Sequence, residues 1–406
     1  MRCARHRAPT GLRAQNDVFA YGSGMLGMTT RTAFVVLAAS LVVACGSGGG
    51  AGGNGGVGGS GGSAGSGGEG GGGGSPEPAF EEFAWQTGTP DVRTERLCAE
   101  AAAPDDAPDT TFIDCDIEGA TFSTEEPPAK DDLVVLAYNI LRGFEVDAQL
   151  DMITSGVDFP VPDVLFLSEV DRGCRRTGFR NIARDYAERL GYYYVYVTEF
   201  VELPSDRGDT GPYDPPLCEH GNALVSRYSL GNVRQIRHAE NRSWYTPPDA
   251  PDPDEPRLGG RIAIAADAKI GSALVRFYVL HLESTLSALD VRDAQAEEIA
   301  VDSEAVPHPV IAGGDLNTFF YYDDIDKGML REPAVKSFVD RGYEDAHQGI
   351  PLDERYTSFD PFDMVIDIIL LRGVELTRAG RCPPERCGSL SDHLPVFAEV
   401  RGVLGQ

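Results

Sequence analysis

The feature of this chain that most limits its fold is a succession of apolar, β-branched segments between residues 131 and 401. Near-continuous aliphatic runs are typical of strands that are buried on both faces. The strands predicted in this way are 133–140, 161–170, 192–200, 222–230, 261–270, 273–284, 308–317, 363–373 and 393–400. Helical spacing is found in 181–191 and 292–303, and the Pro-, Asp- and Gly-rich segments 201–220 and 241–260 are expected to be surface loops. Many strands with few helices between them predict an α/β fold in which two packed sheets are flanked by helices.

The N-terminus has the composition of an export signal. Arg31 precedes an apolar segment, 33–44, that is too short to span a bilayer as a stable helix and is followed by Cys45. The sequence VVAC followed by Gly resembles a bacterial lipobox, in which the cysteine is acylated; a plain secretory signal is the alternative. Residues 1–27 are interpreted as an upstream stretch that translation from Met28 would omit. We therefore expect residues 1–45 to direct export, and the product to be a lipoprotein anchored through Cys45 at the cell surface or facing the periplasm.

A glycine-rich segment follows the signal. Residues 46–75 contain Gly at 20 of 30 positions and cannot bury a core, so they are predicted to be a disordered tether with a reach of about 30 Å. The remaining chain is expected to consist of an N-terminal strap, 76–130, and one folded domain, 131–406. We expect this domain to be a monomer that the tether holds away from a membrane surface.

The charge of the chain narrows its partners. Its formal net charge is −28, and without residues 1–44, which contain five Arg and one Asp, it becomes −32. Such a field repels polyanions within a Debye length, about 8 Å at physiological salt. It disfavours an extended nucleic-acid groove, which needs clustered Lys and Arg, and it leaves room for a small phosphate-bearing substrate in a local basic pocket.

Six cysteines remain after Cys3 and Cys45 are set aside. An even number in an exported chain indicates disulfides, and nearness in sequence favours the pairs 98–115, 174–218 and 382–387 among fifteen pairings. A cysteine-ligated zinc site is the competing interpretation, but no CxxC spacing supports it.

Polar residues gather at the ends of the predicted strands, where ligands bind when the ends meet at one rim of a sheet. They are Asn139, Glu169, Asn222, His281, Asp315, Asn317, Asp367, Asp392 and His393. Glu169 and Asp367 lie in aliphatic surroundings, so each needs a cation, a donor or an imidazole as a partner. Singly, Asn139 could be an ordinary strand-end residue, His281 a core histidine, and the Ser-Asp-His triplet at 391–393 a solvated turn. Their concentration at strand ends favours a common site.

The sequence contains, in this order, the segments AYNI, FLSEVDRG, GNALVSR, RIAIA, VLHLES, IAGGDLN, VIDIIL and SDHLPV. Together they resemble the endonuclease/exonuclease/phosphatase family, which includes deoxyribonucleases, abasic-site endonucleases, sphingomyelinases and inositol-polyphosphate phosphatases. The resemblance covers about residues 131–401. It implies a four-layer α/β/β/α sandwich, with two mixed β-sheets flanked by helices and one active site at the sheet rim. Residues 131–406 would then be the catalytic domain.

The resemblance also implies a metal site. Glu169 would ligate a divalent ion, with Asn139 and Asp392 completing or supporting its shell. Ligation by oxygen atoms alone suits Mg²⁺, with Mn²⁺ or Ca²⁺ as alternatives.

The same resemblance implies catalytic roles for five residues. Asp315 would orient or deprotonate the attacking water, and Asn317 would hold a phosphate oxygen. His393, polarised by Asp367, would stabilise charge on the pentacovalent phosphorus or transfer a proton. His281 would donate to a phosphoryl or leaving-group oxygen.

Three further residues are expected to contact the substrate phosphate: Arg261, Asn222 and Arg176. Arg176 belongs to a cluster that follows Glu169 and consists of Arg172, Arg175, Arg176, Arg180 and Arg184. In so acidic a chain this cluster predicts a positive patch for an extra phosphate or another anionic head group; a solvated arginine-rich turn is the alternative. A 174–218 disulfide would join this loop to the segment CEHGNAL.

The function predicted from these residues is metal-dependent hydrolysis of a phosphodiester or phosphomonoester in a small substrate, by in-line attack of an activated water. An extracellular nuclease is the alternative, although the acidity of the chain and the lack of a Lys-rich stripe count against it. A second alternative is a catalytically silent surface binding module on the same scaffold. That alternative would predict lost catalytic residues, yet Glu169, Asp315 and His393 are all present.

Overall fold

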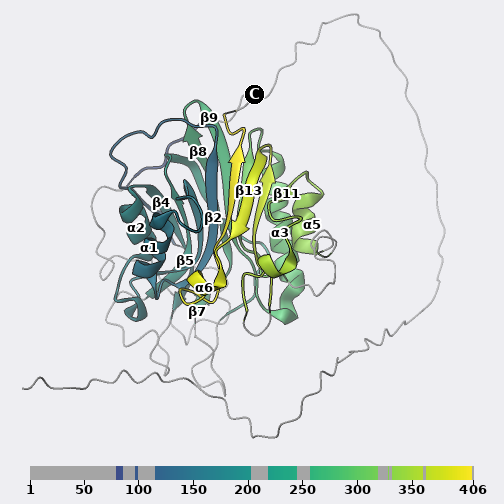
Figure 1. The fold of residues 1–406 in the computed structure, drawn as a ribbon. Helices are drawn as coiled ribbons and strands as arrows, with labels where there is room; N and C mark the ends of the chain where they lie inside the picture. Colours follow the sequence, from purple (N-terminus) through teal and green to yellow (C-terminus); the bar gives the residue numbers. More distant parts are fainter. Residues whose placement is uncertain are drawn as a thin grey trace, which may run out of the picture. The chain divides into compact units, whose positions relative to one another are not determined.

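The computed structural model describes residues 79–85, 97–98, 115–202, 218–244, 257–318, 328, 332–359 and 363–404. These parts of the chain form two β-sheets with helices on their outer faces (Figure 1). The predicted export signal with Cys45 and the predicted tether lie outside the described residues. Among the helices that are described, none is long and apolar enough to cross a bilayer.

The larger sheet has eight strands, of which β2 and β3 form a parallel pair and the other pairs are antiparallel. Its order is β1 (Glu118–Thr121), β4 (Tyr193–Glu202), β5 (Cys218–Ser226), β3 (Val164–Arg172), β2 (Leu133–Arg142), β14 (Val396–Arg401) and β13 (Glu375–Arg381), with β7 (Arg257–Gly259) paired to β4.

The smaller sheet has six strands, and its one parallel pair is β9 with β10. Its order is β11 (Glu344–Asp345), β12 (Asp367–Arg372), β10 (Val310–Asp315), β9 (Ala273–His281), β8 (Ile262–Ile270) and β6 (Leu230–Arg237). Helix α3 (Leu289–Glu304) makes the crossover between the two parallel strands.

The core lies in three apolar layers. Alternate residues of a strand point to opposite faces, so Val135 of β2 packs between the sheets while Leu136 packs under the helices. Helices α1 (Val146–Ser155) and α2 (Ile182–Leu190) cover the larger sheet; α3 and α5 (Pro333–Val339) cover the smaller one (Figure 1). The predicted α/β/β/α sandwich is therefore confirmed.

Shorter elements occupy the connections between strands. Within the described residues they are the 3₁₀ turns Arg175–Thr177, Leu286–Ala288 and Leu352–Glu354, and helix α6 (Pro384–Cys387).

The structure corrects several predicted boundaries. The predicted strand 222–230 is the end of β5 joined to the start of β6, and these two strands belong to different sheets. The predicted loops 201–220 and 241–260 give residues to β4, β5 and β7. The sequence did not predict β6 or β13 because both are edge strands with partly exposed faces, so their residues lack a continuous apolar run.

The predicted strap, 76–130, contributes to both sheets. Its strand β1 pairs with β4 at one edge of the larger sheet. The backbone N–H of Phe83 donates to Leu230 O at 3.0 Å, and Phe83 and Trp85 pack against the core between the sheets. The folded unit therefore includes residues that precede its predicted start at 131.

Three disulfides are present, and they join Cys98 to Cys115, Cys174 to Cys218 and Cys382 to Cys387. These are the pairs that nearness in sequence favours. With all six thiols so paired, the alternative of a zinc site loses its ligands.

Candidate active site

The topology of the sheets brings several strand ends to one rim. In the smaller sheet, Asp315 at the end of β10 is in register with His281 at the end of β9 and with Asp367 at the start of β12. In the larger sheet, β2 and β3 run in parallel toward the rim and carry Asn139 and Glu169, while β14 runs antiparallel to β2 and starts there, just after His393. An antiparallel strand begins where its neighbour ends, which is why polar residues on both sides of a strand meet.

Asn139 joins the two sheets at this rim. Its Nδ2 donates to Glu169 Oε1 at 3.3 Å and to Asp315 Oδ2 at 3.1 Å. Its Oδ1 accepts the backbone N–H of Leu141 at 3.1 Å, and its backbone carbonyl accepts a hydrogen bond from Ser391 Oγ at 2.8 Å. The amide therefore holds two carboxylates side by side.

The backbone at this place is irregular. Glu169 (φ 55°), Leu141 (φ 46°) and Arg142 (φ 62°) adopt left-handed conformations, and the register between β2 and β3 shifts between Asn139 and Arg142. Non-glycine residues in this region cost about 1–3 kcal/mol each, and they persist where surrounding structure holds them. At such an irregularity, a side chain departs from the regular alternation between the two faces of the sheet. The irregularity directs Glu169 toward Asn139.

Glu169 is ionised in this environment. Burial raises the pKa of its carboxyl, but the positive charge of His220, Arg142 and the other histidines nearby outweighs burial and lowers that pKa well below the usual range. An ionised carboxylate on the rim is the form that a divalent cation binds.

His393 and Asp367 form a buried pair. The Nδ1 of His393 lies 2.8 Å from Asp367 Oδ2, and its Nε2 lies 3.8 Å from Asp315 Oδ2. Burial lowers the pKa of His393, but Asp367 and Asp315 outweigh it and raise that pKa to about 10. Burial in turn raises the pKa of Asp367, and the His393 charge opposes that rise. The imidazole is therefore oriented by one carboxylate and directed at another.

Replacing Asp367 by asparagine is expected to lower the pKa of His393, because the carboxylate charge is the largest influence that raises it. The pKa is measured by NMR titration of the labelled imidazole in metal-free protein. A raised folded-state pKa stabilises the fold most below the ordinary value of His, and this contribution is lost as pH rises toward 10. An unchanged titration in Asp367→Asn would contradict the pairing.

Asp392 is exposed at the outer edge of this group, and its electrostatic neighbours include His393 and Glu169. Loss of water around the carboxyl and repulsion from Glu169 raise the pKa of Asp392. Ser391 Oγ lies 3.3 Å from Asp392 Oδ1 and also accepts the backbone N–H of His393 at 3.1 Å, so the Ser-Asp-His triplet is held in place rather than loosely solvated. A divalent cation bound between Glu169 and Asp392 would relieve the repulsion between the two carboxylates. Their oxygen atoms are the ligand type that Mg²⁺, Mn²⁺ and Ca²⁺ prefer.

His281 lies on the other side of Asp315. Its Nε2 is 3.7 Å from Asp315 Oδ2, and its Nδ1 is 2.8 Å from Arg261 and 3.2 Å from Glu199 Oε2. Arg261 is 4 % exposed and also donates to Glu199, so the structure gives this guanidinium protein partners of its own. Asn222 is buried as well, and its Nδ2 donates to Glu199 Oε1 at 3.0 Å. Both residues, which the sequence assigned to the substrate phosphate, hold Glu199 and His281 in this structure.

Asn317 follows Asp315 with a left-handed backbone (φ 49°). Its backbone N–H donates to Asp315 Oδ1 at 2.9 Å, and its Nδ2 donates to Leu282 O at 3.0 Å. The turn therefore fixes both Asp315 and its own amide at the rim.

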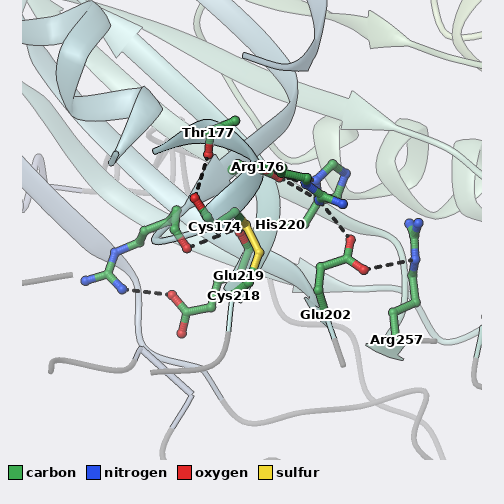
Figure 2. The surroundings of a disulfide bond; sticks show 10 residues. Cys174, Arg176, Thr177, Glu202, Cys218, Glu219, His220 and Arg257 are labelled. Carbon is green, nitrogen blue, oxygen red and sulfur yellow. Dashed lines mark hydrogen bonds and ion pairs between the residues drawn. A yellow bond between two sulfur atoms is a disulfide. The ribbon is translucent and has the colours of Figure 1, made fainter. Parts of the chain in front are cut away.

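The arginine-rich segment after Glu169 differs from the predicted positive patch. Arg172 is buried between Glu118 and Glu219, and Arg176 pairs with Asp171 at 2.6 Å. Arg176 also pairs with Glu202 at 3.2 Å (Figure 2). Arg180 pairs with Asp147 and Asp185, and Arg184 with Glu188. These carboxylates offset the charge of four of the five arginines, while Arg175 is exposed. The segment as a whole is therefore not the predicted positive patch.

Sequence reasoning missed several residues that support the site. Glu199 holds His281 and Arg261, and Ser391 links Asn139 to His393. His220 pairs with Asp171 at 2.9 Å and contributes to the electrostatic environment of Glu169. The signal for Glu199 was a carboxylate inside the β-type run 192–200, the same signal that identified Asp367.

Comparisons with solved structures give similar folds at low identity. An endonuclease/exonuclease/phosphatase from Beutenbergia cavernae is 17 % identical with a TM-score of 0.47, and the match covers 67 % of this chain and 72 % of that one. The human Nocturnin catalytic domain with bound sulfate is 18 % identical with a TM-score of 0.47, over 70 % and 96 % of the two chains. TDP2 from D. rerio, in complex with a single-strand DNA product, is 16 % identical with a TM-score of 0.44, over 67 % and 100 %.

A search among curated proteins gives no match. A family model described as "Endonuclease/Exonuclease/phosphatase family" matches residues 136–393, which is more than half of the chain and includes every rim residue from Asn139 to His393. The chain therefore belongs to the endonuclease/exonuclease/phosphatase family, whose members are hydrolases of phosphate esters that generally use divalent metal ions.

Proposed function

We propose that this protein is a Mg²⁺-dependent phosphoesterase that hydrolyses a small phosphodiester or phosphomonoester by in-line attack of water. The observation that carries this proposal is the arrangement around Asp315. Its Oδ2 lies 3.1 Å from Asn139, 3.7 Å from His281 and 3.8 Å from His393. One carboxylate thus stands between two imidazoles, beside a second, ionised carboxylate on Glu169.

The residues that would hold the metal are Glu169 and Asp392, with Asn139 keeping Glu169 in place. When bound, a divalent ion would neutralise charge on the phosphate and lower the pKa of bound water. Mn²⁺ and Ca²⁺ remain alternatives to Mg²⁺ because all three accept oxygen donors.

Asp315 is assigned to the attacking water. Hydrogen bonds from Asn139 and from the backbone of Asn317 fix both of its oxygens, so the carboxylate presents a constant orientation. In this position it orients the water and accepts its proton as the new bond to phosphorus forms.

The two histidines are assigned to the negative charge that develops on the phosphoryl and leaving-group oxygens. His393 is protonated near neutral pH because of Asp367 and Asp315, so it stabilises negative charge on the phosphoryl oxygens. His281, held by Glu199 and Arg261, donates a proton to the leaving-group oxygen. Asn317 holds a phosphate oxygen at the same rim. Arg261 positions His281 directly, Asn222 positions it by way of Glu199, and Arg176 positions Asp171.

The proposal includes export and anchoring through Cys45. The support is the composition of residues 1–75 together with three disulfides, which persist in oxidising compartments. The formal charge of −28 supports a small substrate over an extended nucleic acid, and we propose that the protein acts as a monomer.

The proposal is tested by assaying the purified protein with Mg²⁺ against a chromogenic phosphodiester, sphingomyelin and DNA, each with an EDTA control. We expect hydrolysis of the small diester that EDTA abolishes and that Mg²⁺ restores. Absence of turnover on every substrate with Mg²⁺, Mn²⁺ or Ca²⁺ would favour the silent binding module, and turnover of DNA alone would favour the nuclease.

A further inference from the structure

A cluster of cations and aromatic rings lies beside the His281 side of the rim. The rings of Phe200 and Trp244 pack edge to face at 5.6 Å. Arg257 lies 4.8 Å from the Phe200 ring centre and 5.5 Å from that of Trp244, and Arg261 lies 5.5 Å and 5.2 Å from the same two centres. Arg242 lies 4.8 Å from the Trp244 ring centre. Guanidinium groups stack on such rings, so one indole holds three cations close together.

The cluster is connected to the rim by hydrogen bonds. Arg261 lies 2.8 Å from His281 and donates to Ser284 Oγ at 3.3 Å. Arg242 donates to the hydroxyl of Thr285, the next residue along the chain. Arg242 therefore lies beside the residues that follow His281.

Two of the three arginines of the cluster have carboxylate partners among the described residues. Arg261 is paired with Glu199 at 3.3 Å, and Arg257 lies 3.8 Å from Glu202, which Arg176 also engages (Figure 2). For Arg242 the described residues provide a hydroxyl and an indole face, and they provide no carboxylate. In a chain with a formal charge of −28, a half-buried guanidinium that has no carboxylate partner among the described residues is a local excess of positive charge.

We propose that Arg242, held by Trp244 and Thr285, is a subsite for a second phosphate group on the substrate, separate from the scissile phosphate. This inference rests on the proposed function, and it assigns the substrate to esters whose alcohol portion carries another phosphate. Arg presents a planar fork that binds phosphate oxygens bidentately, and stacking on Trp244 fixes the direction of the fork. The predicted anion patch is thereby placed at Arg242 instead of the segment from Arg172 to Arg184.

A binding experiment tests the subsite without turnover. The chain has two tryptophans, Trp85 and Trp244, so Trp85→Phe leaves Trp244 as the sole indole reporter. In this background and in EDTA, pyrophosphate is expected to change the Trp244 emission saturably. Arg242→Gln should raise the apparent Kd at least about tenfold, since hydrogen bonds to charged groups contribute strongly, and Arg242→Lys should fall between the two. Arg401→Gln, which alters an exposed arginine paired with Glu375, is the matched control and should keep the Kd. An absent change, or equal Kd values for the two Gln variants, would overturn the subsite.

A kinetic experiment tests whether substrates use it. Thymidine 5′-(p-nitrophenyl phosphate) is compared with the same ester carrying a 3′-phosphate, and the ratio of their kcat/KM values is measured. We expect the 3′-phosphate to be preferred, and the preference to fall at least about tenfold in Arg242→Gln and to persist in Arg401→Gln. If neither ester is hydrolysed, the proposed function fails while the titration still decides the subsite. If the titration succeeds and no preference is seen, the assignment to substrate recognition is overturned.

Discussion

Replacing His393 by alanine is expected to lower kcat by at least about a hundredfold, the lower end of general acid–base effects. The reason is geometric and electrostatic. The imidazole is oriented by Asp367 at 2.8 Å, faces Asp315 at 3.8 Å and remains protonated near neutral pH. Without it, negative charge developing on the phosphoryl oxygens loses one of the positive charges that stabilise it. The measurement is steady-state hydrolysis of a chromogenic phosphodiester at saturating Mg²⁺.

The matched control is His308→Ala. His308 precedes β10, at the opposite end of the strand from Asp315, and pairs with Asp267 at 2.9 Å. Asp267 keeps Arg276 and Asn232 as partners in this variant, so the fold is expected to persist with near-normal kcat. Circular dichroism verifies that both variants fold. A His393→Ala enzyme that folds and turns over at the rate of the control would refute the assignment.

Replacing Glu169 by glutamine is expected to raise the Mg²⁺ concentration for half-maximal activity at least about tenfold. The change keeps the shape of the side chain and removes the charge that the surrounding histidines and Arg142 hold in the ionised form. Loss of one carboxylate from an oxygen-donor site strongly lowers the affinity of the site for a hard cation such as Mg²⁺. The measurement is a metal titration of activity, repeated as calorimetric binding of Mn²⁺ to the substrate-free protein.

Glu188→Gln is the control for this experiment, because Glu188 is exposed on α2 and pairs with Arg184 one turn away. Its titration should match that of the unaltered protein. If Glu169→Gln and Glu188→Gln require the same metal concentration, Glu169 is not a metal ligand, and the metal site has to be sought among Asp315, Asp367 and His393, whose ligand atoms lie within 4.8 Å of one another.

The rim could be predicted because its residues occupy recognisable places along the chain. Asp367 lies within an aliphatic run, and Asp315 follows one directly, so both had to find partners in a core. The structure brings Asp367 to His393, and Asp315 to Asn139, His281 and His393. The predicted position of these residues tolerates an error in the strand boundary, because a strand that is one residue longer still ends at the same rim.

The arginines could not be assigned from the sequence. Arg176, Arg261 and Arg172 are paired with carboxylates from other segments, among them Glu202, Glu199 and Glu118. A guanidinium is available to a ligand only when no such partner reaches it, and that depends on contacts across 26 to 62 residues of chain. Arg242 is the opposite case, because its sequence context offered no reason to assign it to a ligand. Nothing in the segment NRSWY distinguishes it from a solvated arginine.

The amino-acid sequence by itself determined the class of fold and the inventory of acids and imidazoles, because hydrophobic runs and the residues that end them are local properties. Tertiary structure alone decided which cations are neutralised, how the strand after residue 226 passes to the second sheet, and that Glu169 leaves the regular alternation of β3. Those outcomes depend on groups that meet only after the two sheets pack, when burial makes every unpaired charge costly and thereby selects its partner.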